Sequence, residues 1–187
     1  MTVILIILGV GVLFLVVVVA GMYNRLVTAR KQVDNGWSQI DVQLKRRYDL
    51  IPNLVETVKG YAAHEKQLFE NVTKARAHAM DSAGAGVGAR SEAENALGTA
   101  LRGFMIQVEN YPQLKANENF RALQEELTST ENKISFARQF YNDVATGYNT
   151  LRELFPTNMV AGVFGFGPRE LWVITDAAER EAPKVKF

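Results

Sequence analysis

Residues 3–22 read VILIILGVGVLFLVVVVAGM, twenty consecutive residues without a charge. As an α-helix this stretch would be about 30 Å long, which matches the hydrocarbon core of a bilayer. The core helix of a soluble protein rarely runs this far without a polar face. A cleaved signal peptide is the other alternative. It lacks the usual basic residues before the apolar run, although Val18-Val19-Ala20 would be a tolerable cleavage site. We therefore expect a retained transmembrane anchor over residues 1–22. Small residues that would let two such anchors pack closely are Gly9, Gly11, Ala20 and Gly21.

The charges all lie after this stretch, at or beyond Arg25, and they nearly balance, with 21 basic and 20 acidic residues in a chain of 187. A length of this order accommodates one anchor and one domain. The net charge of +1 gives no basis for nucleic-acid binding. The absence of cysteine excludes disulfides and thiolate metal sites. Arg25, Arg30 and Lys31 directly follow the anchor, so the positive-inside rule favours a cytoplasmic location for the rest of the chain.

From Leu26 onward, apolar residues recur at alternating steps of four and three as far as Ala79. This spacing predicts a helix whose apolar seam packs against another helix. Pro52 interrupts the pattern, because it removes one backbone hydrogen bond and its ring crowds the carbonyl of Tyr48. The phase of the repeat nevertheless passes through Pro52 unchanged. It favours a kinked but continuous helix over 23–80, with a turn at 49–51 as the alternative.

The Gly-rich residues 81–90 are expected to form a flexible linker that reverses the chain. Ser91 and Glu94 have the spacing of a capping box, which would start the next helix. A break at 111–116, marked by Pro112, separates that helix from the following one.

A second long seam runs from Phe120 to Phe155 with unbroken three-four spacing. Phe136, Phe140 and Leu154 add a second apolar flank, and the resulting wide face favours a multi-helix bundle over a two-stranded coiled coil. Pro156 is expected to stop this helix.

The tail, 155–187, begins with FPTNMVAGVFGFGP, which is apolar and not helical by pattern. Two interpretations stay open. The tail either packs its phenylalanines on the end of the bundle, or makes a membrane-surface or inter-subunit contact through Phe155, Phe164 and Phe166. Residues 170–181 are expected to form a short helix or strand, and residues 182–187 an extended end.

No combination of residues predicts catalysis or metal binding. His64-Glu65 begins like a zinc-protease motif, but Leu68 stands where the second histidine is needed. His64 and His78 would lie about 21 Å apart on one helix and cannot share a metal. The Gly-x-Gly-x-Gly of the linker follows no strand and precedes no Lys-Ser/Thr, so it does not predict a phosphate loop. We expect no enzyme activity, cofactor or metal.

Two groups of polar residues each allow two interpretations. Lys45-Arg46-Arg47 is either a lipid-headgroup or partner site, or a solvated face from which Arg47 reaches out of the seam to water. Asn142 and Asn149 lie one heptad apart beside the second seam. They either fix the register between helices or are simply exposed.

Several short motifs resemble the signature of the LemA family, and they cover nearly the whole chain. The motifs are Trp37-Ser-Gln-Ile-Asp41, Arg46-Arg47-Tyr48-Asp49-Leu50-Ile51-Pro52-Asn53-Leu54, Lys59-Gly-Tyr61, His64-Glu65, Glu131-Asn132-Lys-Ile134, Ala137-Arg138, Tyr141-Asn142-Asp-Val144, Tyr148-Asn149, Phe155-Pro156-x-Asn158 and Pro183-Lys-Val-Lys-Phe187.

The resemblance implies a bacterial inner (plasma) membrane protein with a single anchor and an all-α fold. The anchor would continue into an antiparallel up-and-down bundle over 23–154, with helices at 24–50, 53–80, 91–111 and 117–154 if Pro52 is a turn. The family brings no catalytic role. Its magnetosome-associated relatives suggest a protein that self-assembles and organises or shapes the membrane. The alternative function is a monomeric adaptor that recruits another membrane protein, such as a protease or a signalling complex. The expected partners are thus the lipid bilayer, further copies of the chain and a membrane protein.

Overall fold

The computed structural model describes residues 1–62 and 64–173. These residues form the helices α1 (Thr2–Lys59), α2 (Lys66–Asp81), α3 (Val87–Val108), α4 (Pro112–Lys115), α5 (Glu118–Glu153) and α6 (Thr157–Val163), with a 3-10 turn, η1 (Ser82–Gly84), between α2 and α3. No strand occurs in the described part of the chain, so the predicted all-α class is confirmed.

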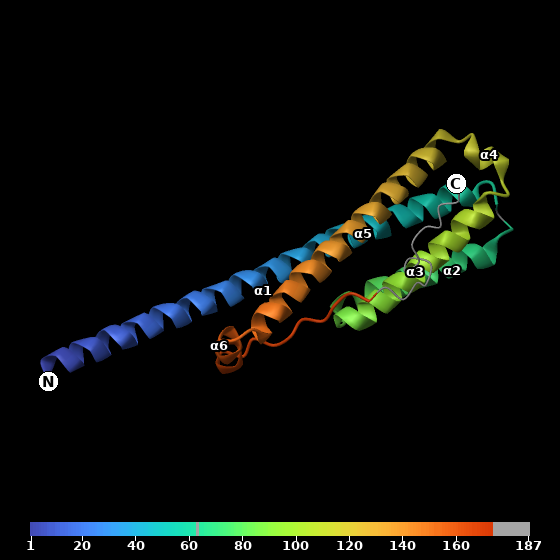
Figure 1. Cartoon of the computed structure of the whole chain (residues 1–187). Helices are drawn as coiled ribbons and strands as arrows, with labels where there is room; N and C mark the ends of the chain where they lie inside the picture. The colour runs from blue at the N-terminus through green and yellow to red at the C-terminus, as the bar shows by residue number, and fades with distance from the viewer. Residues whose placement is uncertain (63, 174–187) are drawn as a thin grey trace, which may run out of the picture.

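Helix α1 is one unbroken helix of 58 residues, about 87 Å long, whose first part projects bare from the body (Figure 1). Residues 1–17 are exposed all round the helix. Its most apolar 18-residue window has a mean hydropathy of 3.4, and none of that window is buried within the molecule. A soluble protein would bury such a helix. The core-helix alternative is therefore wrong, and in the described residues α1 alone is long and apolar enough to cross a membrane.

Pro52 lies inside α1, so the alternative of a turn at 49–51 is wrong. The carbonyl of Tyr48, which has no N–H partner at Pro52, instead accepts a 2.8 Å hydrogen bond from Nε of Arg76 on α2. The expected continuous helix over 23–80 is also wrong. Helix α1 ends at Lys59, and the amides of Tyr61 and Ala62 close its last turn by donating to the carbonyl of Val58. The chain therefore reverses between Lys59 and Lys66, and α2 is a separate helix.

The expected linker 81–90 is mostly helical, because α3 already begins at Val87. The predicted capping box is wrong for the same reason. Ser91 is inside α3 and donates to the carbonyl of Gly88 at 2.8 Å, while the side chain of Glu94 points into the protein. The break at 111–116 contains the single turn α4. Helix α5 is capped by Asn117, whose side chain accepts from the amide of Phe120.

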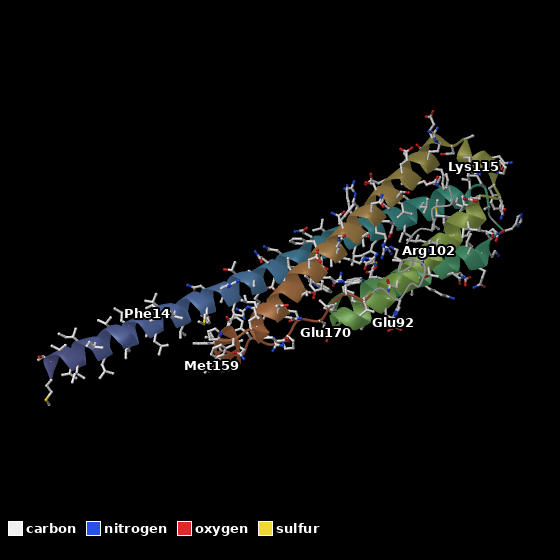
Figure 2. All side chains as sticks on the ribbon, viewed as in Figure 1. Phe14, Glu92, Arg102, Lys115, Met159 and Glu170 are labelled. Atoms are coloured by element: carbon white, nitrogen blue, oxygen red, sulfur yellow. The ribbon has the colours of Figure 1, made fainter. Side chains whose placement is uncertain are left out.

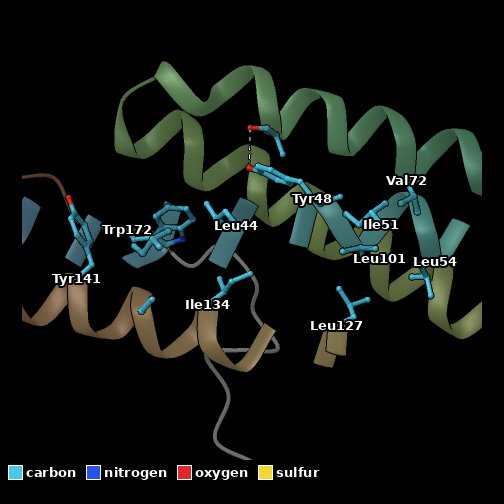
Figure 3. Packing of buried hydrophobic residues seen from close by; sticks show 14 of the residues in the cluster. Leu44, Tyr48, Ile51, Leu54, Val72, Leu101, Leu127, Ile134, Tyr141 and Trp172 are labelled. Atoms are coloured by element: carbon cyan, nitrogen blue, oxygen red, sulfur yellow. Dashed lines mark hydrogen bonds between the residues drawn. The ribbon is translucent and has the colours of Figure 1, made fainter. Parts of the chain in front are cut away.

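The bundle consists of two helix pairs, because α1 packs along α5 and α2 packs along α3 (Figure 1). Helices α3 and α5 make few direct contacts, so one side of the bundle is open. Most of the core between the pairs is apolar (Figure 3). It includes Ile40, Leu44, Ile51, Leu54, Val72, Leu97, Leu101, Phe104, Leu127 and Ile134.

The predicted seam is buried or half-buried from Phe120 to Leu151, but its last member, Phe155, is exposed. The expected second apolar flank of α5 does not pack into the bundle. Phe136, Phe140 and Leu154 are exposed. The tail also differs from expectation, because residues 157–163 form α6. Residues 164–173 then run back along α5 without regular structure. In the expected helix or strand over 170–181, residues 170–173 are neither, and the rest lies outside the described residues, as does the expected extended end.

Candidate functional site

A charged cluster lies in the middle of the bundle, where an apolar core would be the usual choice. Arg47 on α1 is only 3% exposed and forms ion pairs with Glu94 on α3 and with Glu131 on α5, the latter at 3.0 Å. The Tyr48 hydroxyl donates to the same Glu94 carboxylate. Arg47 thus connects three helices. The interpretation that this side chain reaches out to water is wrong.

A second buried arginine extends the cluster. Arg90 on α3 pairs with Asp41 on α1 at 2.5 Å, and its guanidinium lies 5.1 Å from the ring centroid of Trp37. Removing one partner of such a pair leaves an uncompensated buried charge, which typically costs about 3–5 kcal/mol. The cluster therefore fixes how the α2–α3 pair sits on the α1–α5 pair.

Electrostatics in this region keeps tyrosine hydroxyls protonated. Burial, followed by the hydrogen bond to the Glu94 carboxylate, raises the pKa of Tyr48 well above its ordinary value. Burial also raises the pKa of Tyr141 on α5. At the far end of the bundle, the hydrogen bond to Glu65 raises the pKa of Tyr111. These hydroxyls stay neutral donors at physiological pH. Tyr48 and Tyr111 donate to the carboxylates of Glu94 and Glu65, and Tyr141 donates to a backbone carbonyl. No group of three or more His, Cys, Asp or Glu in the described residues could hold a metal ion.

The returning tail is held against α5 by a repeated pair of residues, Tyr-Asn. Asn149 accepts from the amide of Arg169 at 2.9 Å and donates to the carbonyl of the same residue at 2.8 Å. Asn142 makes the same two bonds with Trp172, at 2.8 and 3.1 Å. The side-chain amides of the two asparagines thereby form hydrogen bonds with backbone groups of the tail that have no partner in a strand.

The tyrosines of the two pairs complete this clamp. Tyr148 donates to the carbonyl of Gly167 at 2.9 Å, and Tyr141 donates to that of Glu170 at 2.8 Å. Residues 167–172, which we call the strap, are therefore fixed at four points. Neither interpretation of Asn142 and Asn149, as register-setting residues or as exposed ones, describes them: they bind the strap.

The strap places Trp172 beside the charged cluster. Its ring lies 6.0 Å from that of Trp37 and under the guanidinium of Arg138, and it is almost fully buried. Trp37 in turn packs on Tyr141 at 5.4 Å. The structure therefore joins six predicted family-motif residues in one assembly with the strap: Trp37, Arg138, Tyr141, Asn142, Tyr148 and Asn149.

Other predicted residues lie apart from this assembly. Arg46 forms an exposed ion pair with Glu126, and Asp49 forms one with Lys45. Asn53 and Asn132 are exposed, and the Tyr61 hydroxyl accepts from Asn117 at 2.9 Å at the far end. Gly9, Gly11, Ala20 and Gly21 are exposed on the bare part of α1. Phe166 is buried, whereas Phe155 and Phe164 are exposed.

Sequence reasoning missed Arg76, Arg90, Glu94 and Trp172. A signal existed for two of them. Residues 90, 94, 97, 101, 104 and 108 follow the same three-four spacing, so Arg90 and Glu94 continue the buried seam of α3. No local pattern indicates Arg76 or Trp172, because their partners are remote in sequence.

Two of the surface grooves that the described residues form lie beside α5. One, of about 750 Å³, lies on the outer face of α1 and α5 and is lined by Gln39, Val42, Lys133, Phe136 and Phe140 among others. The other, of about 710 Å³, lies between α3 and α5 and is lined by residues that include Leu101, Met105, Ile106 and Leu127.

Comparison with known proteins finds relatives that carry two names. The chain is 26% identical to the Magnetosome protein MamQ 2 of Paramagnetospirillum magneticum over 168 residues, which cover 77% of this chain and 62% of the relative. It is 25% identical to the Magnetosome protein MamQ of Magnetospirillum gryphiswaldense over 186 residues, covering 85% and 68%. It is also 26% identical to the Protein LemA of Metamycoplasma hominis over 155 residues, covering 83% and 69%.

The chain spans about three-fifths of the length of the first of these relatives. The profile of the LemA family matches residues 36–187, a range that contains the charged cluster, the clamp and the strap. The relatives, together with the exposed apolar helix, support a membrane-associated helical protein. The resemblance inferred from the motifs is confirmed, and the chain belongs to the LemA family.

Proposed function

We propose that this protein is a non-enzymatic membrane scaffold, which anchors through α1, associates with further copies and organises or shapes the bacterial membrane. The observation that carries the proposal is the continuity of α1. One helix runs from the exposed apolar residues 3–17 to core residues such as Leu44 and Ile51. A bundle built on its own anchor helix transmits the rotation or clustering of one to the other.

The proposed location is the inner membrane, with the body on the cytoplasmic side. Arg25, Arg30 and Lys31 are the first charges after the anchor, and they favour this orientation by the positive-inside rule. Within the bilayer, Gly9, Gly11, Ala20 and Gly21 would allow close approach of anchor helices.

Outside the membrane, the outer face of α1 and α5 supports self-association. Val42, Phe136 and Phe140 are exposed there beside the groove of about 750 Å³. Apolar side chains gathered on one face are typical of interaction surfaces. The relatives named magnetosome proteins support a role in organising a membrane.

The test is the size and shape of the full chain, extracted in mild detergent and imaged by electron microscopy. We expect particles containing several copies with their anchors gathered together. A particle that stays strictly monomeric at high protein concentration would contradict self-assembly.

A second candidate function, recruitment of a partner protein by a monomeric adaptor, is favoured by the open groove between α3 and α5. Ile106 is exposed at this groove beside the half-buried Met105. A photo-crosslinking residue placed at Ile106 or at Phe136 in cells separates the two functions. Scaffolding predicts self-crosslinks from Phe136, whereas recruitment predicts crosslinks from Ile106 to a different protein.

A further inference from the structure

Helix α6 caps the end of the bundle from which the bare part of α1 projects (Figure 1). It is held there by aromatic contacts: the ring of Tyr23 lies 5.0 Å from Phe164 and 5.6 Å from Phe166. The guanidinium of Arg30 lies 5.0 Å from the Phe166 ring. Val19 and Met22, in the last turns of the apolar stretch, pack against the same core. The α6 end of the bundle therefore sits at the level where the proposed anchor ends.

The two faces of α6 differ in what they contact. Thr157, Val160 and Ala161 are buried against the bundle. The side chains of Met159 and Val163 on the helix, and of Phe155 just before it, are exposed. Residues 154–168 contain no charged residue. An apolar surface of this kind on a protein marks a contact with a partner or a membrane.

The position of Tyr23 fixes the depth of this surface. Residues 3–22 match the hydrocarbon thickness, so Tyr23 falls at the membrane–water boundary, where tyrosine and tryptophan are enriched. Phe164 packs on Tyr23, so α6 lies at the same depth. In Figure 2, Met159 is at the end of the bundle nearest to Phe14 on the bare helix.

We propose that α6, together with Phe155 just before it, forms a second membrane contact. The side chains of Phe155, Met159 and Val163 insert between the lipid headgroups of the leaflet nearest to the bundle. This inference rests on the membrane anchoring proposed above. Lipid is the expected occupant because the contact between Phe164 and Tyr23 holds this uncharged face at the level where the proposed anchor meets the bilayer surface. The nearby Arg25, exposed on α1, suits an anionic headgroup. Two contacts on one leaflet fix the angle of the body to the membrane, which the anchor helix alone would not.

The chain contains no cysteine, so single cysteines can carry an environment-sensitive fluorophore without background labelling. The full chain is reconstituted into vesicles of phosphatidylcholine and phosphatidylglycerol, some carrying a nitroxide high on the acyl chain. The reporter is Met159→Cys, which replaces a residue 63% exposed, and the matched control is Ile106→Cys on α3, which replaces one 67% exposed. Phe14→Cys in the bare helix, read with a nitroxide placed near the end of the acyl chain because Phe14 would lie deep in the bilayer, reports the anchor itself.

We expect the nitroxide lipid to quench the label at Met159 several-fold more than the label at Ile106, and the Met159 emission to shift to the blue. Equal, weak quenching at these two sites with strong quenching at Phe14 would overturn the inference while the anchor stands. No quenching at Phe14 would overturn the anchor and the inference with it. A third outcome is a Met159 label that lipid does not quench and that is shielded from aqueous iodide only at high protein density. That result would show that a second copy of the chain covers α6, and it would also overturn the inference.

Discussion

At the residue scale, Arg76 replaces the hydrogen bond that Pro52 removes from α1. The proline removes the donor for the carbonyl of Tyr48, and Arg76 supplies one from another helix. This arrangement explains how a helix with an internal proline continues for another seven residues, to Lys59. The same hydrogen bond connects α2 to α1. Because its acceptor is a backbone carbonyl, no side-chain substitution on α1 removes that acceptor.

The Arg76→Met substitution should destabilise the protein by about 1–3 kcal/mol, because it leaves a carbonyl of the buried Tyr48 without a partner. The cost should be smaller in a Pro52→Ala background, where the restored N–H can serve that carbonyl. Thermal unfolding of the two single variants and the double variant in detergent gives this coupling. Lys74→Met, which breaks only an exposed ion pair with Glu70, is the control and should change little. Additive effects of Arg76→Met and Pro52→Ala would contradict the compensation.

Tyr48 makes the stability of the bundle sensitive to alkaline pH. Its pKa is raised in the folded state, so the unfolded chain loses this proton first, at about pH 10. The contribution is present below that pH and is lost as the pH rises above it. We expect Tyr48→Phe to lose about 1 kcal/mol at neutral pH, from the missing bond to Glu94, and to show a shallower decline above about pH 10. Part of the decline should remain, because the pKa values of Tyr111 and Tyr141 are raised too.

Melting temperatures measured between about pH 8 and about pH 11 check this expectation. The control is Tyr61→Phe, at an exposed residue at the far end of the bundle. A decline as steep in Tyr48→Phe as in the parent chain would show that another group is responsible.

At the scale of the elements, the seams were predictable and the ends were not. Residues such as Leu44 on α1 and Ile134 on α5 are buried because helical spacing alone places them on one face. The end of α1 was missed because the seam continues in phase into α2, whose Val72 and Ala79 pack on the same core. Gly60, at the C-cap, was the available signal.

The charged cluster and the strap could be predicted only in part. Arg47 was a visible exception on an apolar seam, and the spacing of α3 pointed to Glu94. The repeated Tyr-Asn was visible as well, but its partners are backbone groups that nothing in their own sequence marks. Bonds between remote segments depend on the finished fold.

The strap should be released by the double substitution Asn142→Ala and Asn149→Ala. The amides of Arg169 and Trp172 then lose their acceptors, and we expect their hydrogen exchange to become at least several-fold faster. The amides of α5 itself should keep their protection, because the seam of α5 is untouched. Mass-spectrometric exchange resolves the two segments. Asn132→Ala, at an exposed position of the same helix, should leave the strap unchanged. Faster exchange throughout α5 would mean that the asparagines support the helix instead.

At the scale of the whole molecule, the chain is a rod with a different surface at each level. The bare part of α1 presents apolar side chains on every side, and α6 presents them on one face beside it. The body presents the α1–α5 groove and the α3–α5 groove. Because α1 runs through all these levels, the rotation of the anchor about its axis determines which body face meets a neighbour. Contacts between the bodies of two copies and close packing of their anchors must therefore both be possible at the same rotation of α1.

The outer face of α1 and α5 is the surface whose change should alter assembly. We expect Phe136→Glu combined with Val42→Glu to shift the detergent-extracted protein towards monomer, because both side chains are exposed and their charges would repel across a contact between copies. Light scattering coupled to gel filtration measures the mass. Ile106→Glu is the control for an added charge at a similarly exposed apolar residue, and it should leave the mass unchanged. Dissociation by Ile106→Glu alone would place the contact between copies at the α3–α5 groove. If none of these variants changes the mass of an assembled particle, the anchors are the elements that hold the copies together, and substituting Gly9 and Gly11 by leucine is then the change that should separate them.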